Sequence, residues 1–204
     1  MSKVKLGGGT LLSPVPAVMV TTRDENGKDN IITIAWTGIV SSHPPKAYIS
    51  VRPERYSYDI IKETGVFAIN LTTSSLARAA DLCGVKTGKK VDKFAACGLE
   101  KYEVEDFPVP LIAESPLSLC CRVSDVVPLG SHDMFISDIV SVYANEELFD
   151  KNGKLCLYRS PLAAYSHGEY FELGDKLGKF GYSVAKKPPK NKPKAKHKAG
   201  KSKK

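Results

Sequence analysis

Short segments with β-strand composition dominate the sequence, and they limit the fold more than any other feature. They are rich in Val, Ile, Tyr and Thr and are bounded by Gly, Pro, Asn and Asp, which is typical of strands joined by turns. The pair Asn26-Gly27 predicts a hairpin after the first segment, and "PLGSHD" at 128–133 predicts another after the fifth. The expected strands are 17–22, 31–40, 47–51, 66–71, 117–127, 134–143 and 154–158.

Helices are expected to be few. Ser57 is predicted to be the N-cap of a short helix that ends before Gly65, and Ser75 to begin a second helix that Gly84 ends. Many short strands with two or three helices indicate a mainly β fold, either a β-barrel or a β-sandwich with added helices. The 204 residues suit one domain of ordinary size, which we expect over residues 1–185.

Charge is concentrated at the end of the chain. The formal net charge is +8, but residues 186–204 contain ten lysines and no acid, so residues 1–185 carry 8 minus 10, or −2. This lysine-rich tail has no large apolar residue and is predicted to be disordered. Two interpretations stay open, because such a tail binds polyanions non-specifically in some proteins and only increases solubility in others.

The remaining composition argues against several classes of protein. No run of about 18 apolar residues occurs, so no membrane span is predicted. The first twenty residues are interrupted by glycines and prolines, unlike a secretory signal, and a cytoplasmic location is expected. The five cysteines are odd in number and lack CxxC spacing, so neither a disulfide framework nor a zinc or other metal site is predicted. We expect them to be buried thiols.

The expected strand 31–40 has one unusually small face. Alternation along a strand places Thr33, Ala35 and Thr37 on the same side, while the bulky Trp36 points to the other. Small side chains leave the backbone accessible to a flat ligand such as an aromatic ring system. They also permit close contact with another strand or helix, and the pattern by itself does not decide between the two.

The next segment, "AYISVRPERYSYDII" at 47–61, has the composition of an anion site. Ser50 and Arg52 share a strand face, and Arg55 and the expected cap Ser57 follow where a helix begins. Free N–H groups at a helix N-terminus, a cap hydroxyl and guanidinium groups together can hold a phosphate monoester. The alternative is an ordinary helix cap with solvated arginines.

A flat floor beside a phosphate site would fit flavin mononucleotide (FMN). Residues 30–71, the segment "DLCGVKTGKKVDKF" at 81–94 and "GSHDMFISDIV" at 130–140 resemble the flavin reductase-like family, which includes flavoredoxins and ferric reductases. The resemblance extends over about residues 14–182. It implies a homodimer of FMN-binding split β-barrels with a few short helices, in which NADH or NADPH reduces FMN.

The resemblance also implies roles for individual residues. Lys90 and Lys93 would approach the flavin or the nicotinamide, unless they are exposed loop lysines. His132 would face the flavin, unless it is a turn histidine bonded to backbone. His167 and Tyr170 would close the cleft or else pack against the barrel. The implied cofactor-binding residues are Thr33, Ala35, Trp36 and Thr37 at the isoalloxazine and ribityl chain, and Ser50, Arg52 and Ser57 at the phosphate.

Three functions are compatible with these features. The first is an FMN-dependent oxidoreductase that uses NAD(P)H and passes electrons to flavin, ferric complexes or an electron-transfer protein. The second is a flavoredoxin-type electron shuttle without its own NAD(P)H activity, which tight retention of FMN beside Trp36 would suit. The third is a nucleic-acid-associated module that has lost its cofactor and acts through its tail.

Overall fold

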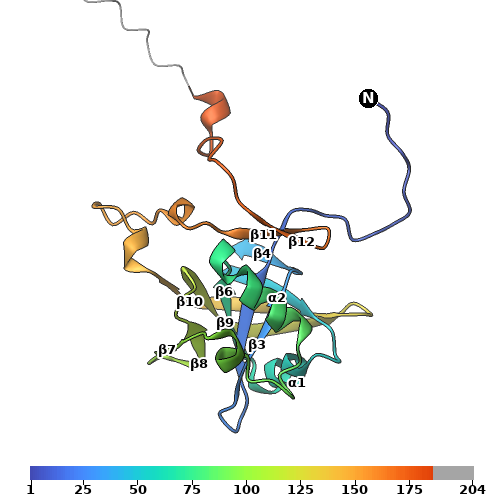
Figure 1. Cartoon of the computed structure of the whole chain (residues 1–204), viewed down its shortest axis with the longest axis vertical. Helices are drawn as coiled ribbons and strands as arrows, with labels where there is room; N and C mark the ends of the chain where they lie inside the picture. The colour runs from blue at the N-terminus through green and yellow to red at the C-terminus, as the bar shows by residue number, and fades with distance from the viewer. Residues whose placement is uncertain (186–204) are drawn as a thin grey trace, which may run out of the picture. The chain divides into compact units, whose positions relative to one another are not determined.

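The computed structural model describes residues 1–185. The lysine-rich tail, residues 186–204, lies outside the described residues, and its predicted disorder and polyanion binding therefore stay predictions. The chain divides into two compact units, Met1–Gly174 and Asp175–Lys204. The first contains the strands and α-helices, whereas the described part of the second contains one 3-10 turn, η4 (Tyr182–Val184) (Figure 1). The predicted domain end at residue 185 also stays a prediction.

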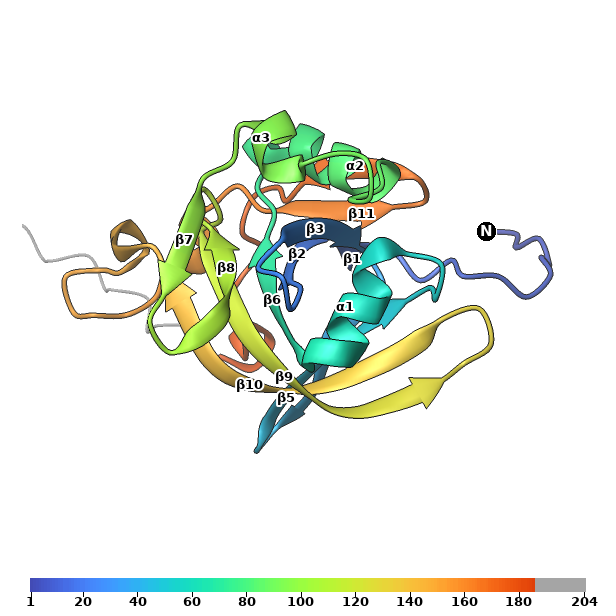
Figure 2. The same ribbon diagram turned by 90° about the horizontal axis from the view of Figure 1, so that it is seen from below.

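A seven-stranded antiparallel sheet forms the main body of the first unit, so the predicted mainly β fold is confirmed. Seen from below, the sheet curls around helix α1 (Tyr56–Thr64), which lies within the curve (Figure 2). In spatial order its strands are β3 (Asp29–Ile34), β2 (Val18–Arg23), β6 (Val66–Leu71), β9 (Leu117–Pro128), β10 (Asp133–Ala144), β5 (Pro45–Val51) and β4 (Thr37–Ser42).

Both predicted hairpins are present. Gly27, with a φ of 78°, turns the chain from β2 to β3, and Gly130, with a φ of 90°, turns it from β9 to β10. Side chains with a Cβ rarely adopt this left-handed conformation, which explains why both turns contain glycine.

Two predicted strands were wrong. The segment 31–40 is not one strand, because the chain bends at Ala35 and Trp36 between β3 and β4. At this bend the Ser50 N–H donates to the Trp36 carbonyl at 2.8 Å. The segment 154–158 pairs only through one bridge of Leu155 with Phe149. The chain then forms the 3-10 helix η3 (Leu157–Arg159). The segment therefore has no partner strand beyond this bridge, although its composition is typical of a strand.

The sequence did not reveal two smaller sheets and two other helical elements. Their strands are too short for a visible alternation, and β8 contains two prolines that weaken a strand prediction. The elements are β1 (Val15–Pro16), β11 (Ala163–Ser166) and β12 (Glu169–Glu172) in one sheet, β7 (Lys101–Val104) and β8 (Phe107–Ile112) in the other, and helices α3 (Lys93–Cys97) and η2 (Glu146–Leu148).

The predicted helix near Ser75 is present but has different ends. A 3-10 turn, η1 (Ser74–Leu76), leads into α2 (Ala77–Val85), which continues through Gly84. Gly84 was predicted to end this helix, but it is needed inside it. A Cβ at this position would lie 3.4 Å from the Cβ of Thr33 on β3, so glycine lets helix and strand approach closely.

The part of the sheet formed by β2, β3, β6 and the first half of β9 is covered on both faces. Its concave face packs around Tyr58 and Ile61 of α1, with Phe67 and Phe135 among the fully buried side chains. On the convex face, α2 and α3 cover β2 and β3, while β7 and β8 cover β6 and β9. Coverage on two faces explains why the first five residues of β2 are all buried and do not alternate between buried and exposed.

The five cysteines are free, and all but Cys97 are buried, so the expected burial is confirmed for four of them. The Cys83 and Cys97 sulfurs lie 3.9 Å apart between α2 and α3. Burial raises the pKa of the Cys83 and Cys121 thiols to about 12, which leaves both protonated at neutral pH. Within residues 1–185, no helix is long and apolar enough to cross a membrane.

Candidate functional site

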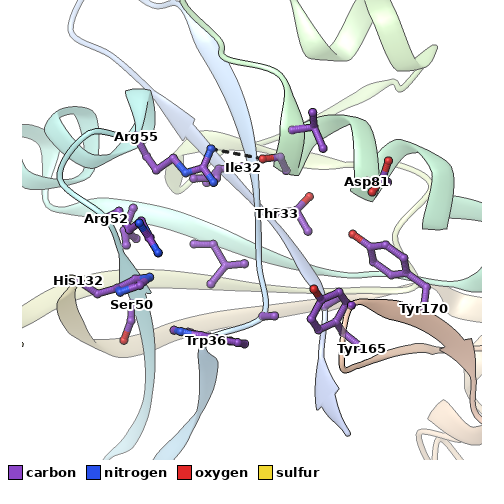
Figure 3. A pocket seen from close by; sticks show the side chains of 17 residues that line it. Ile32, Thr33, Trp36, Ser50, Arg52, Arg55, Asp81, His132, Tyr165 and Tyr170 are labelled. Carbon is purple, nitrogen blue, oxygen red and sulfur yellow. Dashed lines mark hydrogen bonds between the residues drawn. The ribbon is translucent and has the colours of Figure 1, made fainter. Parts of the chain in front are cut away.

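A cavity of about 330 Å³ lies where the bend between β3 and β4 meets the end of β5, helix α2 and the β11–β12 hairpin. Its size falls within the range of small-molecule sites. The lining has two chemically different ends, joined by a floor that includes Ile32, Thr33 and Trp36 (Figure 3), and Ala35 also lines the cavity. We call Ser50, Arg52, Arg55 and His132 the arginine end, and Asp81, Tyr165 and Tyr170 the tyrosine end.

The arginine end begins where β5 stops. Ser50 and Arg52 line the cavity together, as the predicted strand alternation requires. The Arg52 side chain is 52% exposed, and its only ion pair within residues 1–185 is a long contact of 3.5 Å to Glu54. Its guanidinium group is therefore available to bind an anion.

Arg55 links this end to helix α2. Its backbone N–H donates to the Arg52 carbonyl at 3.0 Å, which closes the turn before α1. Its guanidinium Nη1 donates to the Gly84 carbonyl at 3.5 Å, near the C-terminus of α2, where the helix dipole favours a cation. This contact is the dashed line in Figure 3. The sequence predicted Arg55 near the helix start but not among the binding residues.

His132 enters the arginine end from the β9–β10 turn (Figure 3). The Ser131 hydroxyl lies 2.9 Å from its Nδ1, and its carbonyl accepts from the Leu129 N–H. Burial lowers the pKa of His132, and the charge of Arg52 lowers it further. The imidazole is therefore mostly neutral at pH 7 and does not add a third positive charge.

The floor agrees only in part with the predicted small face. Thr33 and Ala35 line the cavity, but the Thr33 hydroxyl donates to the Ala80 carbonyl on α2 at 2.5 Å. Its small size thus serves a close helix-to-strand contact as well as the cavity. Trp36 also lines the cavity, although it was predicted on the opposite face, because the bend at residues 35–36 interrupts the alternation.

Thr37 and Ser57 do not line this cavity. Thr37 is buried, and its hydroxyl donates to the Tyr48 carbonyl at 2.7 Å. Ser57 is not the N-cap of α1, because the cap is the extended residue Arg55 and the helix begins at Tyr56, two residues earlier than predicted. The Ser57 side chain therefore points inward, where it accepts a hydrogen bond of 2.8 Å from the Asn30 amide.

The two lysines lie elsewhere. Lys90 is exposed in the turn before α3 and lines neither this cavity nor the smaller one beside it. Lys93 is only 3% exposed, and its ammonium group donates to the carbonyls of Ile31 at 2.5 Å and Cys83 at 2.8 Å. Burial lowers its pKa. Lys93 thus binds β3 to α2 beside an adjoining cavity of about 110 Å³, which Ser57 also lines and which shares Arg55 and Gly84 with the larger one.

The tyrosine end was largely missed. Tyr165 of β11 and Tyr170 of β12 pack edge to face, with ring centroids 5.4 Å apart, opposite Asp81 of α2 (Figure 3). Burial raises the pKa of Tyr170, and the Asp81 charge raises it further. The alternative in which Tyr170 closes the cleft agrees with its place in the lining. His167 does not line the cavity, since it occupies the hairpin turn with a φ of 51°.

Comparisons with known proteins agree with this architecture. The sequence matches the flavin reductase-like domain family over residues 11–174. The structure of flavoredoxin from Desulfovibrio vulgaris (Miyazaki F) is similar with a TM-score of 0.84 and 30% identity, covering 90% of this chain and all of that one. A split-barrel domain protein of Shewanella frigidimarina has a TM-score of 0.77 and 26% identity, covering 85% and 88%.

Two further sequences are similar to this chain. A protein of Aeropyrum pernix is 32% identical over 150 residues, which are 73% of this chain and only 57% of that relative. The FMN reductase (NADH) RutF of Enterobacter cloacae is 26% identical over 124 residues, covering 61% of this chain and 73% of that one. The domain match and the structural likeness confirm the predicted split β-barrel, and the chain belongs to the flavin reductase-like family.

Proposed function

We propose that this chain binds FMN in the 330 Å³ cavity and acts as an FMN-dependent oxidoreductase that takes hydride from NADH or NADPH. One observation carries the proposal. The guanidinium groups of Arg52 and Arg55 line the same cavity as the Trp36 ring and a floor of small residues, so an anionic group and a planar group can be bound together. The names of the flavoredoxin and FMN reductase relatives support it further.

The residues present fit FMN. Arg52 has an exposed guanidinium group for bidentate contact with the phosphate, Ser50 can add a hydroxyl, and Arg55 adds positive charge beside the N-terminus of α1. Ala35 leaves room for a flat ring, and Trp36 offers an aromatic surface. Thr37, Ser57, Lys90 and Lys93 are not part of this proposed site, because their side chains lie outside the cavity.

The chain's own residues orient reactants and set the charge around them. Flavin, when bound, supplies the hydride and electron chemistry. Arg52 and Arg55 give the arginine end a positive potential, which favours a flavin that has gained negative charge. His132 is neutral at pH 7, so it can exchange hydrogen bonds there without raising that potential.

A second candidate function is an electron shuttle, which passes electrons from FMN to the same kinds of acceptor but does not itself oxidise NAD(P)H. Electrons from FMN would pass to free flavin, to ferric complexes or to an electron-transfer protein. Likeness to a flavoredoxin favours a shuttle without NAD(P)H activity as the alternative. Anaerobic mixing of FMN-loaded protein with NADH and with NADPH separates the two, since only the NAD(P)H oxidoreductase loses its yellow colour at a useful rate.

FMN binding is tested first by the visible spectrum of the purified protein and by FMN titration. We expect a yellow protein, or saturable uptake of one FMN per chain. A colourless protein that takes up no FMN would contradict the proposal and favour the cofactor-less nucleic-acid module.

We also propose a homodimer. Strands β4, β9 and β10 carry exposed apolar side chains, of which Ile39 is 64% exposed and Val142 is 52% exposed. Exposed apolar surface of this kind is common where a second subunit packs. Light scattering during size exclusion should give about twice the 22.2 kDa of one chain, and a monomer at micromolar concentration would contradict the proposal.

A cytoplasmic location and a polyanion-binding tail complete the proposal. The five free thiols are typical of proteins from a reducing compartment. Truncation after Ala185 should leave FMN content unchanged and lower the salt-sensitive retention on heparin. Unchanged retention would leave the tail without a role in polyanion binding.

A further inference from the structure

The two ends of the cavity carry opposite charge. Among the described residues that line the cavity, Asp81 is the only carboxylate, and it faces the cavity from α2 across the floor from Arg52 and Arg55 (Figure 3). Within residues 1–185 the Asp81 side chain has no ion pair and no side-chain hydrogen bond. A carboxylate with no partner is free to interact with a bound molecule.

Two aromatic rings stand beside this carboxylate. Tyr165 and Tyr170 both line the cavity, and their edge-to-face packing fixes the orientation of the pair. Tyr170 senses the charge of Asp81, since that charge contributes to the raised pKa of its phenol. A negative charge next to electron-rich ring faces is the chemical environment that attracts a planar cation.

We propose that the tyrosine end binds the nicotinamide ring and that Asp81 stabilises the positive charge which that ring gains as it gives up hydride. This inference rests on the proposed function, because it takes NAD(P)H as the hydride donor. The dihydropyridine ring is neutral. When a proton with two electrons leaves its C4 for the flavin, the ring becomes a pyridinium cation, so its charge rises by one during the step.

A carboxylate beside that ring lowers the energy of the charge as it develops. The effect is greater in the transition state and product than in the neutral reactant, which is the condition for a catalytic contribution. Asp81 is largely exposed, and solvent screening therefore keeps the gain modest. The same charge makes the oxidised nicotinamide bind more tightly than a neutral ring of the same shape.

The test uses two small probes of nearly equal shape and different charge, 1-methylnicotinamide, a cation, and nicotinamide, which is neutral. Their dissociation constants are measured by ligand-observed NMR titration with FMN-loaded protein and its Asp81→Asn variant. Asp81→Asn should weaken the cation about threefold to tenfold, the size of one screened charge contact, and change the neutral probe less than about twofold.

Glu169→Gln is the matched control, because Glu169 is an exposed acid on β12 that does not line the cavity. It should leave both dissociation constants unchanged. Tyr170→Leu should weaken both probes, and the cation more strongly. The inference would be overturned if Asp81→Asn weakened the two probes equally. It would also be overturned if Glu169→Gln weakened the cation as much as Asp81→Asn does.

The proposed function and this inference fail in different ways. Absence of FMN uptake by the native chain would refute the proposed function. If the native chain takes up FMN saturably but Asp81→Asn does not alter the preference for the cation, only the role of Asp81 is refuted. Far-ultraviolet circular dichroism of each variant checks that the substitution has not unfolded the chain.

Discussion

At the arginine end of the cavity two guanidinium groups and a neutral imidazole meet, whereas at the tyrosine end one carboxylate stands beside two phenol rings. The first end comes from a single strand-to-helix turn and a neighbouring hairpin. The second combines α2 with a hairpin some eighty residues further along the chain. Both ends therefore join segments that are far apart in the sequence, but in the first end Ser50, Arg52 and Arg55 come from one local segment.

The difference in charge gives the two ends different tasks. Positive charge beside a helix N-terminus suits a phosphate that stays bound throughout the reaction. A partly solvated carboxylate with aromatic rings suits a ligand whose charge changes and which must leave. Substitutions at the arginine end should accordingly change FMN affinity most, and those at the tyrosine end should change discrimination among second ligands.

The largest effect is expected from Arg52→Ala. Loss of a charge-assisted contact to phosphate should weaken FMN binding by about 1.5 to 3 kcal/mol. Fluorescence titration of FMN measures the change. Arg78→Ala is the matched control, because Arg78 is exposed on α2 and does not line the cavity. An unchanged dissociation constant for Arg52→Ala would remove this residue from the arginine end.

Lys93→Met tests whether this lysine belongs to the arginine end or to the core. It would leave the Ile31 and Cys83 carbonyls without a buried donor and should lower the free energy of unfolding by about 1 to 3 kcal/mol. FMN affinity of the folded variant should change little. Urea denaturation gives the first quantity, and Lys90→Met, at an exposed site, should stay within about 0.5 kcal/mol. Equal stability of the two variants would contradict the assigned position of Lys93.

Ser57→Ala tests in the same way whether Ser57 belongs to the arginine end or to the core. The buried Asn30 amide loses its acceptor, so the free energy of unfolding should fall by about 1 kcal/mol. FMN affinity should stay the same, since Ser57 faces the smaller cavity. Ser42→Ala, on the exposed part of β4, serves as control. A marked loss of FMN binding with normal stability would place Ser57 in the phosphate site after all.

The smallest effect concerns pH and His132. Its pKa in the folded chain is below the ordinary value of 6.5, so the unfolded chain takes up the proton first as pH falls. The free energy of unfolding should therefore decrease on acidification from about pH 6.5 down to the folded pKa, and stay reduced below it. His132→Gln should remove this part of the decrease in urea denaturation at several pH values. An identical pH profile for both proteins would show that His132 is not perturbed.

The sequence predicted what is encoded locally. Strand alternation placed Ser50 and Arg52 together, and turn chemistry located the hairpin that carries His132. The strand prediction failed at the bend of residues 35–36. Only the pairing with β5 shows that the segment 31–40 divides into two strands, β3 and β4. Ser57 was misplaced because the helix starts two residues earlier than predicted, and this shift places the side chain in the core and not at the helix end.

The tyrosine end shows why the rest was not predictable. Tyr165 and Tyr170 lie on four-residue strands, and Asp81 is an ordinary exposed residue of a helix. None has a spacing or composition typical of a binding site. They meet only because the β11–β12 hairpin lies beside the cavity, a tertiary contact that local patterns do not contain.

Binding of FMN compared with riboflavin tests the central claim most directly, because the two ligands differ only in the phosphate. We expect the native chain to bind FMN much more tightly than riboflavin, and the ratio of the two dissociation constants to fall close to one in Arg52→Ala/Arg55→Ala. A ratio that is the same in both proteins would mean that the phosphate does not bind at the arginine end.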